Sequence, residues 1–240
     1  MRVAVISDIH GNLPALDAVL ADLARDPPEA VWCAGDFVGY GPWPDACVQR
    51  IATADIPSIA GNYDEKTLAF PRKKEKWAAK KDPRKYRAFE HAYENLSPES
   101  RAYLAALPKT LRETVAGHRL LMVHAAPDSE KDGLHPLTSP LRLRAIAGAA
   151  GADVILTGHT HWPMVRRSAG ALFVNAGSTG RPGDGDTRAA YAVLTLREAA
   201  PPEAEIRRAA YPVERVVEAL ASAGLPPEFA TLYRTGRAAL

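Results

Sequence analysis

Seven side chains with metal-binding chemistry follow short apolar runs in this 240-residue sequence. They comprise two carboxylates, four imidazoles and one carboxamide: Asp8, His10, Asp36, Asn62, His124, His159 and His161. Mixed nitrogen and oxygen donors suit Mn, Fe, Zn, Co or Ni better than Ca or Mg. Each fragment alone could be a surface turn or a buried histidine. Because one sequence supplies all of them in order, each at the end of an apolar run, the set indicates a metal site.

The spacing within two of these fragments also predicts geometry. Asp8 and His10 are two residues apart, and so are His159 and His161. In an extended chain, residues two apart point to the same side of the strand. We therefore expect each pair to be able to reach one metal ion from a strand end.

The candidate ligands must be positioned by buried strands. Apolar runs of four to eight residues between turn signals are typical of such strands. The expected strands are residues 3–6, 30–34, 56–60, 120–123, 154–156, 171–174, 190–196 and 205–211. After the first strand, apolar residues from Leu13 to Leu23 recur at helical spacing, with Asn12 as the N-cap and Pro14 in the first turn. Repetition of strand, turn and helix predicts an α/β fold with one mixed sheet or two sheets, whose strand ends gather the ligands.

Two segments lack the strand pattern and are expected to be helical. The first is an insert at about residues 66–112, with a helix start at Ser97, and the second is a tail at about residues 212–240. The insert begins with ten basic residues against only two acidic ones between Lys66 and Arg87. That run is either a solvated helical cap or a surface for a polyanion such as RNA or a nucleotide, with Trp77 or Tyr86 available for stacking.

Composition excludes several other classes of protein. Hydrophobic residues make up 47% of the chain, enough for a sizeable core, and a net charge of +2 gives no global argument for nucleic-acid or membrane binding. Cys33 and Cys47 do not form a disulfide framework by spacing, which fits a reducing compartment. The first apolar run is too short for a secretory signal, and we find no run of membrane-spanning length. We therefore expect a single cytoplasmic domain over residues 1–240.

Six motifs in order, DIHGN, GDFVGYGP, GNYD, VHAAP, GHTH and NAGSTGRP, resemble the motif series of the calcineurin-like metallophosphoesterase superfamily. They are most similar to its small prokaryotic phosphodiesterase branch. The resemblance implies a four-layer sandwich of two mixed β-sheets flanked by helices. It also implies two divalent transition-metal ions, with manganese expected first. Asp8, His10 and His161 would hold one ion, Asn62, His124 and His159 would hold the other, and Asp36 would bridge them. A hydroxide between the ions would attack the phosphate ester.

The sequence departs from the family pattern at Tyr63, where the superfamily usually has a histidine thought to protonate the leaving oxygen. Tyrosine has an ordinary pKa of about 10 and is a poor proton source near neutral pH. We assign no protein general acid, and the departure favours diesters, or activated esters, over ordinary phosphomonoesters. The expected substrate is a small phosphodiester or nucleotide. Tyr63 either packs over the metal pocket or contacts substrate, and Asp64 either orients a ligand or stabilises its turn. Further supporting or substrate-contact roles are predicted for Asn12 and Asn175.

Three alternatives remain at this point. A phosphomonoesterase or protein phosphatase would use the same metal site. A non-catalytic scaffold on this fold would be expected to have lost ligands. An RNA-binding module would use the basic residues between positions 66 and 87. The sequence does not indicate an oligomeric state.

Overall fold

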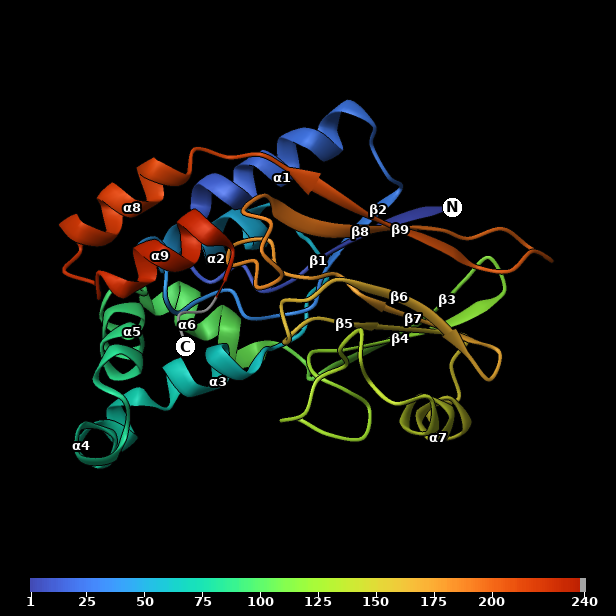
Figure 1. Cartoon of the computed structure of the whole chain (residues 1–240), viewed down its shortest axis with the longest axis horizontal. Coiled ribbons are helices and arrows are strands. Elements are labelled where there is room, and N and C mark those ends of the chain that lie inside the picture. Colours follow the sequence, from blue (N-terminus) through green and yellow to red (C-terminus); the bar gives the residue numbers. More distant parts are fainter. Residues whose placement is uncertain (238–240) are drawn as a thin grey trace.

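The protein is described by a computed structural model over residues 1–237. Two mixed β-sheets lie face to face with helices on their outer faces, so the molecule has four layers (Figure 1). The first sheet has the order β2-β1-β8-β9, with β1 (Arg2–Ile6), β2 (Ala30–Cys33), β8 (Ala189–Thr195) and β9 (Glu203–Ala209). The second has the order β3-β4-β5-β7-β6, with β3 (Thr110–Val115), β4 (His118–Val123), β5 (Val154–Thr157), β6 (Met164–Ser168) and β7 (Ala171–Asn175). The predicted sandwich of two mixed sheets is confirmed.

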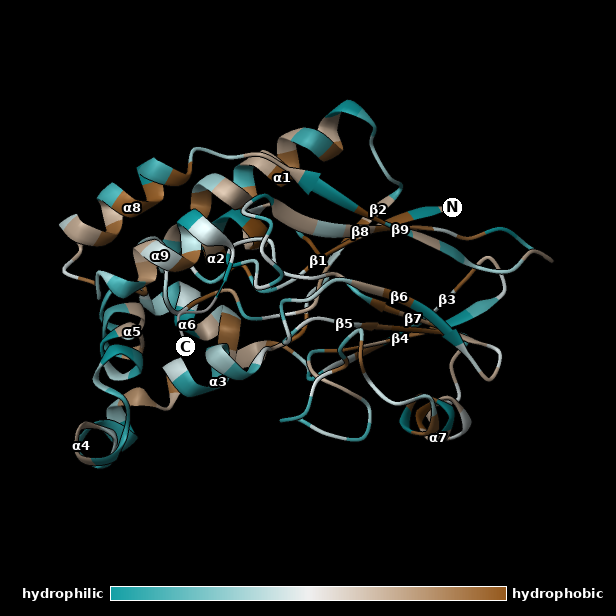
Figure 2. Ribbon diagram, viewed as in Figure 1, coloured by the Kyte–Doolittle hydropathy of each residue, from teal (hydrophilic) through white to brown (hydrophobic). Residues whose placement is uncertain are grey.

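Three layers of apolar side chains hold the sheets and helices together. Between the sheets, Val5 of β1 and Leu194 of β8 pack with Met122 of β4 and Val174 of β7. The outer face of the first sheet is covered by α1 (Leu13–Arg25), α2 (Pro44–Thr53) and α6 (Pro98–Ala106), and that of the second by α7 (Pro140–Ala150). The central strands β4 and β7 are accordingly strongly hydrophobic ribbons, whereas β9 and α4 (Phe70–Lys80) are largely hydrophilic (Figure 2).

The remaining helices gather at one end of the sandwich (Figure 1). They are α3 (Asn62–Leu68), α4 (Phe70–Lys80), α5 (Pro83–Glu94), α8 (Val213–Ser222) and α9 (Glu228–Thr235). Ala88 of α5 packs with Val216 and Leu220 of α8 and with Phe229 of α9. The helical segments expected near residues 66 and 212 therefore contact each other, although they are far apart in the sequence. The tail prediction also covers residues 238–240, which lie outside the described residues.

Two predicted boundaries differ from the structure. The helical insert was expected to reach residue 112, but helix α6 ends at Ala106 and strand β3 begins at Thr110. Pro108 prevents continuation of the helix, and the largely exposed β3 pairs only with β4, so its sequence carries little apolar signal. Residues 56–60 were expected to be a strand, but they form a single bridge between Ser58 and Cys33. Pro57 there lacks a backbone donor for further pairing.

Both cysteines, Cys33 and Cys47, are free and buried. Burial raises the pKa of each thiol, so neither is an activated nucleophile. Within residues 1–237, none of the helices has both the length and the apolar character needed to cross a membrane.

Candidate metal centre

The seven predicted ligands converge where strands of the two sheets end. Asp8 and His10 follow β1, Asp36 follows β2, and His124 follows β4. His159 and His161 follow β5, whereas Asn62 is the first residue of α3. Strands from both sheets thus deliver side chains to one point, as expected for ligands at the carboxyl ends of strands.

The backbone around these residues is not extended. Left-handed φ angles occur at five of the seven: Asp8 (53°), His10 (49°), Asp36 (57°), His159 (68°) and His161 (61°). This conformation costs residues other than glycine of order 1–3 kcal/mol each and persists only where the surroundings enforce it. The prediction that extended backbone places the paired residues is therefore wrong. Sharp turns after β1 and β5 aim them instead.

One half of the centre contains Asp8, His10 and His161. The Nε2 atom of His161 lies 3.2 Å from Asp8 Oδ1 and 3.1 Å from His10 Nε2. His10 Nε2 is 3.7 Å from the same Asp8 oxygen. These three residues thus present three mutually close ligand atoms.

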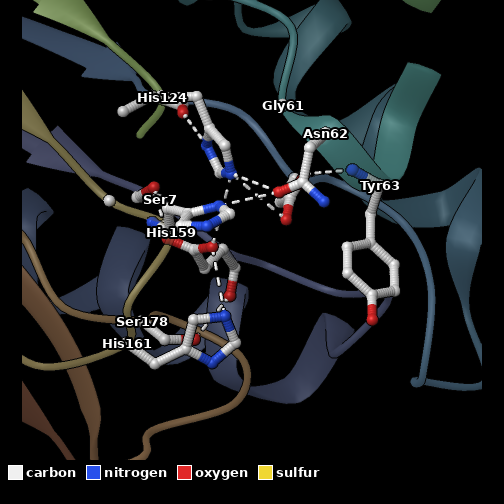
Figure 3. Close-up of polar contacts among 12 residues, drawn as sticks. Ser7, Gly61, Asn62, Tyr63, His124, His159, His161 and Ser178 are labelled. Atoms are coloured by element: carbon white, nitrogen blue, oxygen red, sulfur yellow. Dashed lines mark hydrogen bonds and ion pairs between the residues drawn. The ribbon is translucent and has the colours of Figure 1, made fainter. Parts of the chain in front are cut away.

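The other half contains Asn62, His124 and His159 (Figure 3). Asn62 Oδ1 lies 3.1 Å from His124 Nε2 and 2.8 Å from His159 Nδ1. His159 therefore faces a different half from His161, and the two histidines of the GHTH motif do not meet at one point as their spacing suggested. Asp36 Oδ2 lies between the halves, 3.3 Å from His124 Nε2 and 3.7 Å from His10 Nε2.

Main-chain carbonyl groups fix the orientation of all four imidazoles. The outward ring nitrogens and their partners are His10 Nδ1 with Val38 (3.0 Å), His124 Nδ1 with Ala34 (2.8 Å), His161 Nδ1 with Arg181 (2.7 Å) and His159 Nε2 with Lys131 (2.9 Å). A carbonyl oxygen can only accept, so each outward nitrogen must donate its proton. In the neutral ring the inward nitrogen then carries a lone pair, which is the arrangement found in metal-binding histidines.

Acceptor atoms consequently face one another across the centre. The His10 and His161 inward nitrogens are 3.1 Å apart, and Asp8 Oδ1 has no hydrogen-bond donor within the described part of the chain. Lone pairs this close repel unless a cation or proton lies between them. The donor set, with two carboxylates, neutral imidazoles and one carboxamide, fits divalent transition-metal ions.

Two of the imidazoles titrate in opposite directions without metal. Burial lowers the pKa of His10 to about 3, so this ring is neutral. Burial also opposes the charged form of His124, but the Asp36 carboxylate outweighs it and raises the pKa of His124 to about 10. In the metal-free protein, a proton on His124 therefore partly neutralises the pair of buried carboxylates.

Asp64 positions the loop that carries Asp36. Its carboxylate accepts hydrogen bonds from the backbone N–H groups of Asp36 (2.9 Å), Phe37 (2.9 Å) and Gly61 (2.8 Å). Burial and the Asp36 charge raise the pKa of Asp64 to about 8, while these amide donors favour the ionised form. The contacts match both roles considered for Asp64, because the Gly61 bond caps its own turn at the start of α3, whereas the Asp36 and Phe37 bonds hold the loop of a candidate ligand.

Tyr63 is packed into an aromatic group beside the centre. Its ring is edge-on to His10 at 5.1 Å and stacked on Phe89 at 4.9 Å, and its hydroxyl is hydrogen-bonded to the Tyr40 hydroxyl. Burial and Tyr40 raise the pKa of Tyr63 above its ordinary value. In Figure 3 the ring extends away from His124 and His159, while the Tyr63 backbone N–H donates to Asp36 Oδ1 at 2.6 Å. These contacts match the packing role.

The two remaining predicted residues brace loops. Asn12 accepts from the Ala15 N–H at 3.2 Å as the N-cap of α1, and its amide donates to the Gly180 carbonyl at 2.7 Å. Asn175 donates to the Gly158 carbonyl at 2.7 Å and to the Thr160 hydroxyl at 3.0 Å. Both side chains are fully buried, so they act on the backbone of the site and are not free to contact substrate.

Arg181 was not singled out from the sequence. Its Nη1 lies 3.4 Å from His161 Nδ1, and its guanidinium lies over the Tyr40 ring at 4.1 Å from the centroid. In the sequence, the only sign of this residue was an arginine within the glycine-rich NAGSTGRP segment, a pattern typical of a turn. Its contact with Tyr40, which belongs to another loop, arises only in the folded chain.

Comparisons with known proteins agree with this architecture. Residues 1–199 match the family model of the calcineurin-like phosphoesterase superfamily domain. An uncharacterised protein of Methanocaldococcus jannaschii is 30% identical over 241 residues, which cover 93% of each chain. A metallophosphoesterase structure from Sphaerobacter thermophilus matches with a TM-score of 0.80 at 27% identity, over 98% of this chain and 99% of that one. A hypothetical protein from Pyrococcus horikoshii has a TM-score of 0.86 at 22% identity over 99% of both chains, which shows a shared fold.

Proposed function

This chain belongs to the calcineurin-like phosphoesterase superfamily, and we propose that it is a dinuclear metal-dependent phosphodiesterase. The observation that carries the proposal is the convergence of ligand atoms from seven buried or half-buried side chains, among which Asp8 Oδ1 and the inward nitrogens of His10 and His161 have no donors to satisfy them. The family is metal-dependent, and manganese is the ion we expect first. Asp8, His10 and His161 would hold one ion, Asn62, His124 and His159 the second, and Asp36 both.

A pair of such ions lowers the pKa of a water molecule and draws negative charge away from phosphoryl oxygens. The protein residues supply orientation. Backbone carbonyls hold the four imidazoles in one tautomer, and Asp64 holds the Asp36 loop. Preorganisation of this kind means that little reorganisation is needed when a phosphate ester binds.

The preference for diesters rests on Tyr63. The Tyr63 hydroxyl is hydrogen-bonded to the Tyr40 hydroxyl, and the pKa of Tyr63 is raised. Tyr63 is therefore poorly suited to protonate a leaving alkoxide. General acid catalysis is typically worth roughly 10²–10⁴-fold. Without it, the enzyme should favour phosphate diesters or esters with stable leaving groups over ordinary phosphomonoesters.

The test is a comparison of two substrates with the same leaving group. With added Mn²⁺, we expect kcat/KM for bis(p-nitrophenyl) phosphate to exceed that for p-nitrophenyl phosphate. The reverse order would support a phosphomonoesterase and contradict the diester preference. His10→Ala and Asp36→Ala should abolish hydrolysis of both, and full activity in either variant would contradict the dinuclear site.

A non-catalytic scaffold is the alternative from another class. All seven candidate ligands are retained and oriented here, which argues against it. Absence of both bound transition metal and hydrolysis would favour the scaffold instead.

A further inference from the structure

A cavity of about 270 Å³ lies beside the half of the metal centre that contains His10 and His161. Four regions line it, namely the loop after β2, the loop after β7, the start of α5, and α9, with the residues Tyr40, Arg181, Asp82, Arg84, Lys85, Glu228, Phe229 and Leu232. Two of these residues connect it to the centre. The Tyr40 ring is 5.3 Å from the His10 ring, and Arg181 contacts His161.

Arg181 is held in place while two of its donor nitrogens, Nε and Nη1, lack acceptors. Stacking on Tyr40 fixes the guanidinium plane, and its buried Nε has no hydrogen-bond partner within residues 1–237. Its Nη1 faces His161 Nδ1, but that nitrogen already donates to the Arg181 carbonyl and cannot also accept. Buried donors are nearly always paired, so unpaired ones beside a cavity indicate a ligand with acceptor oxygens.

The charges of the cavity favour an anion. Arg84 is neutralised by Asp82, with Nη2 and Oδ2 2.7 Å apart. Arg181 and Lys85 form no ion pair with any described acidic group, and the carboxylate of Glu228 opposes them only in part. An arginine fork with a nearby lysine is suited to the oxygens of a phosphate group.

The basic run of α3 to α5 extends this charge outward from the cavity. Among its ten basic residues, only Arg84 and Arg87 form ion pairs with described acidic residues. Lys85 belongs both to this run and to the cavity lining. The Tyr40 face toward Arg181 is covered by the guanidinium, so the cavity recognises charge there and not a stacked base.

We propose that this cavity is a subsite for a second phosphate group of the substrate, bound by Arg181 and Lys85. The inference rests on the proposed function, because it places the hydrolysed diester at the metal centre and the second phosphate beside it. The substrate class is then a nucleotide derivative with more than one phosphate. Two sources share this chemistry: phosphates separated by a nucleoside, as in an oligonucleotide, and adjacent phosphates, as in a nucleoside diphosphate.

A binding experiment tests the subsite without turnover. Mn²⁺-loaded protein is titrated calorimetrically at constant Mn²⁺ concentration with thymidine 5′-monophosphate, thymidine 3′,5′-bisphosphate and thymidine 5′-diphosphate. Charge-assisted hydrogen bonds predict that at least one two-phosphate ligand binds about tenfold or more tightly than the monophosphate. Preference for the bisphosphate identifies nucleoside-spaced phosphates, and preference for the diphosphate identifies adjacent ones. Equal affinity for all three overturns the proposal.

Variants assign the effect to the cavity. Arg181→Gln should remove the preference, Arg181→Lys should keep part of it, and Lys85→Gln should weaken it by a few-fold. Arg188→Gln is the matched control, because Arg188 follows the same strand but is paired with Asp186 and does not line the cavity. If Arg181→Gln does not fold, unchanged preference in Lys85→Gln together with an effect in the Arg188 variant would contradict the assignment.

Activity separates this inference from the proposed function. With Mn²⁺, the dinucleotide TpT is compared with forms that carry an added 5′- or 3′-phosphate, and bis(p-nitrophenyl) phosphate reports on the metal centre alone. One outcome contradicts the subsite but not the proposed function: the simple diester is hydrolysed, an added phosphate does not increase the rate, and no two-phosphate ligand binds preferentially. Preferential binding of a two-phosphate ligand without hydrolysis of any diester supports the subsite and contradicts the function.

Discussion

At the scale of single residues, the proposed preference for diesters rests on two aromatic hydroxyls beside the candidate metal centre. Tyr63 occupies the position at which a histidine proton donor is usual in the superfamily, and Tyr40 engages its hydroxyl. The ring instead fills space between His10 and Phe89. Specificity for the leaving group should therefore respond to substitution of this residue alone.

Tyr63→His should reduce the dependence of rate on leaving-group pKa. The introduced imidazole has an ordinary pKa of about 6.5 and can donate a proton near neutral pH. The measurement is the slope of log kcat/KM against leaving-group pKa for a series of aryl diesters with Mn²⁺. We expect a shallower slope than in the wild type, with Tyr63→Phe as the control that keeps the steep slope. Equal slopes in the histidine variant and the wild type would show that Tyr63 does not set this preference.

The raised pKa of His124 predicts how the affinity for metal depends on pH. The Asp36 carboxylate outweighs the burial penalty and raises the pKa of His124 to about 10, so near neutrality the metal-free protein carries a proton that a metal ion must displace. Displacement of one proton makes the apparent affinity rise about tenfold per pH unit below that pKa. Competition against a chelator of known pH dependence at pH 7 and pH 8 measures the change. Constant affinity over this range would mean that His124 is neutral before the metal binds.

At the scale of elements, the site depends on close approach between turns that follow different strands. Gly158, which precedes His159 after β5, lies against the turn after β1. A Cβ atom added there would come within 1.9 Å of Ser7 Oγ and 2.4 Å of Asp8 Oδ2. The His159 N–H, which follows Gly158, donates to that Asp8 oxygen at 2.9 Å, so the turns are in direct contact.

Gly158→Ala should therefore displace Asp8 and lower metal affinity by at least about tenfold, because the clash is relieved only by moving one of the two turns. The matched control is Gly148→Ala in α7, where an added Cβ meets no atoms within 4 Å. In that exposed helical position alanine should raise the free energy of unfolding by about 0.5–1 kcal/mol. Metal titration and urea unfolding of both variants provide the measurements. Wild-type metal affinity in Gly158→Ala would refute the proposed packing of the turns.

The sequence predicted the buried strands that end at the site, because apolar runs before Asp8, His124 and His159 are distinctive. It did not predict β3 or β6, whose exposed faces carry polar residues and which pair on one side only. The arrangement as a sandwich of two mixed sheets came from the family resemblance, and no strand order was predicted. Local pattern cannot specify which distant strands pair.

The candidate ligands themselves could be identified from residue type and position, but their backbone geometry could not. Left-handed φ angles at Asp8 and His159 are enforced by neighbouring turns that a linear pattern does not contain. Arg181 was missed for a related reason, since its position depends on the Tyr40 ring from another loop.

At the scale of the whole molecule, the centre lies at one end of the sandwich, and the helical end places basic residues on one side of it. Asn62 begins α3, and the basic run follows through α4 and α5 to the cavity at Lys85. The tail helix α9 closes the same cavity with Phe229 and Leu232. The helical segments therefore contribute to the surroundings of the metal centre, whereas the sheets supply most of its ligands.

The central claim is that the seven side chains bind two metal ions together. The most direct measurement is equilibrium dialysis of the chelator-treated protein against Mn²⁺, with bound metal and protein quantified in the same sample. We predict saturation at two ions per chain and a lower stoichiometry in Asp36→Asn, because this carboxylate lies between the two halves. Saturation of the wild-type protein at one ion per chain, or no binding, would contradict the dinuclear centre.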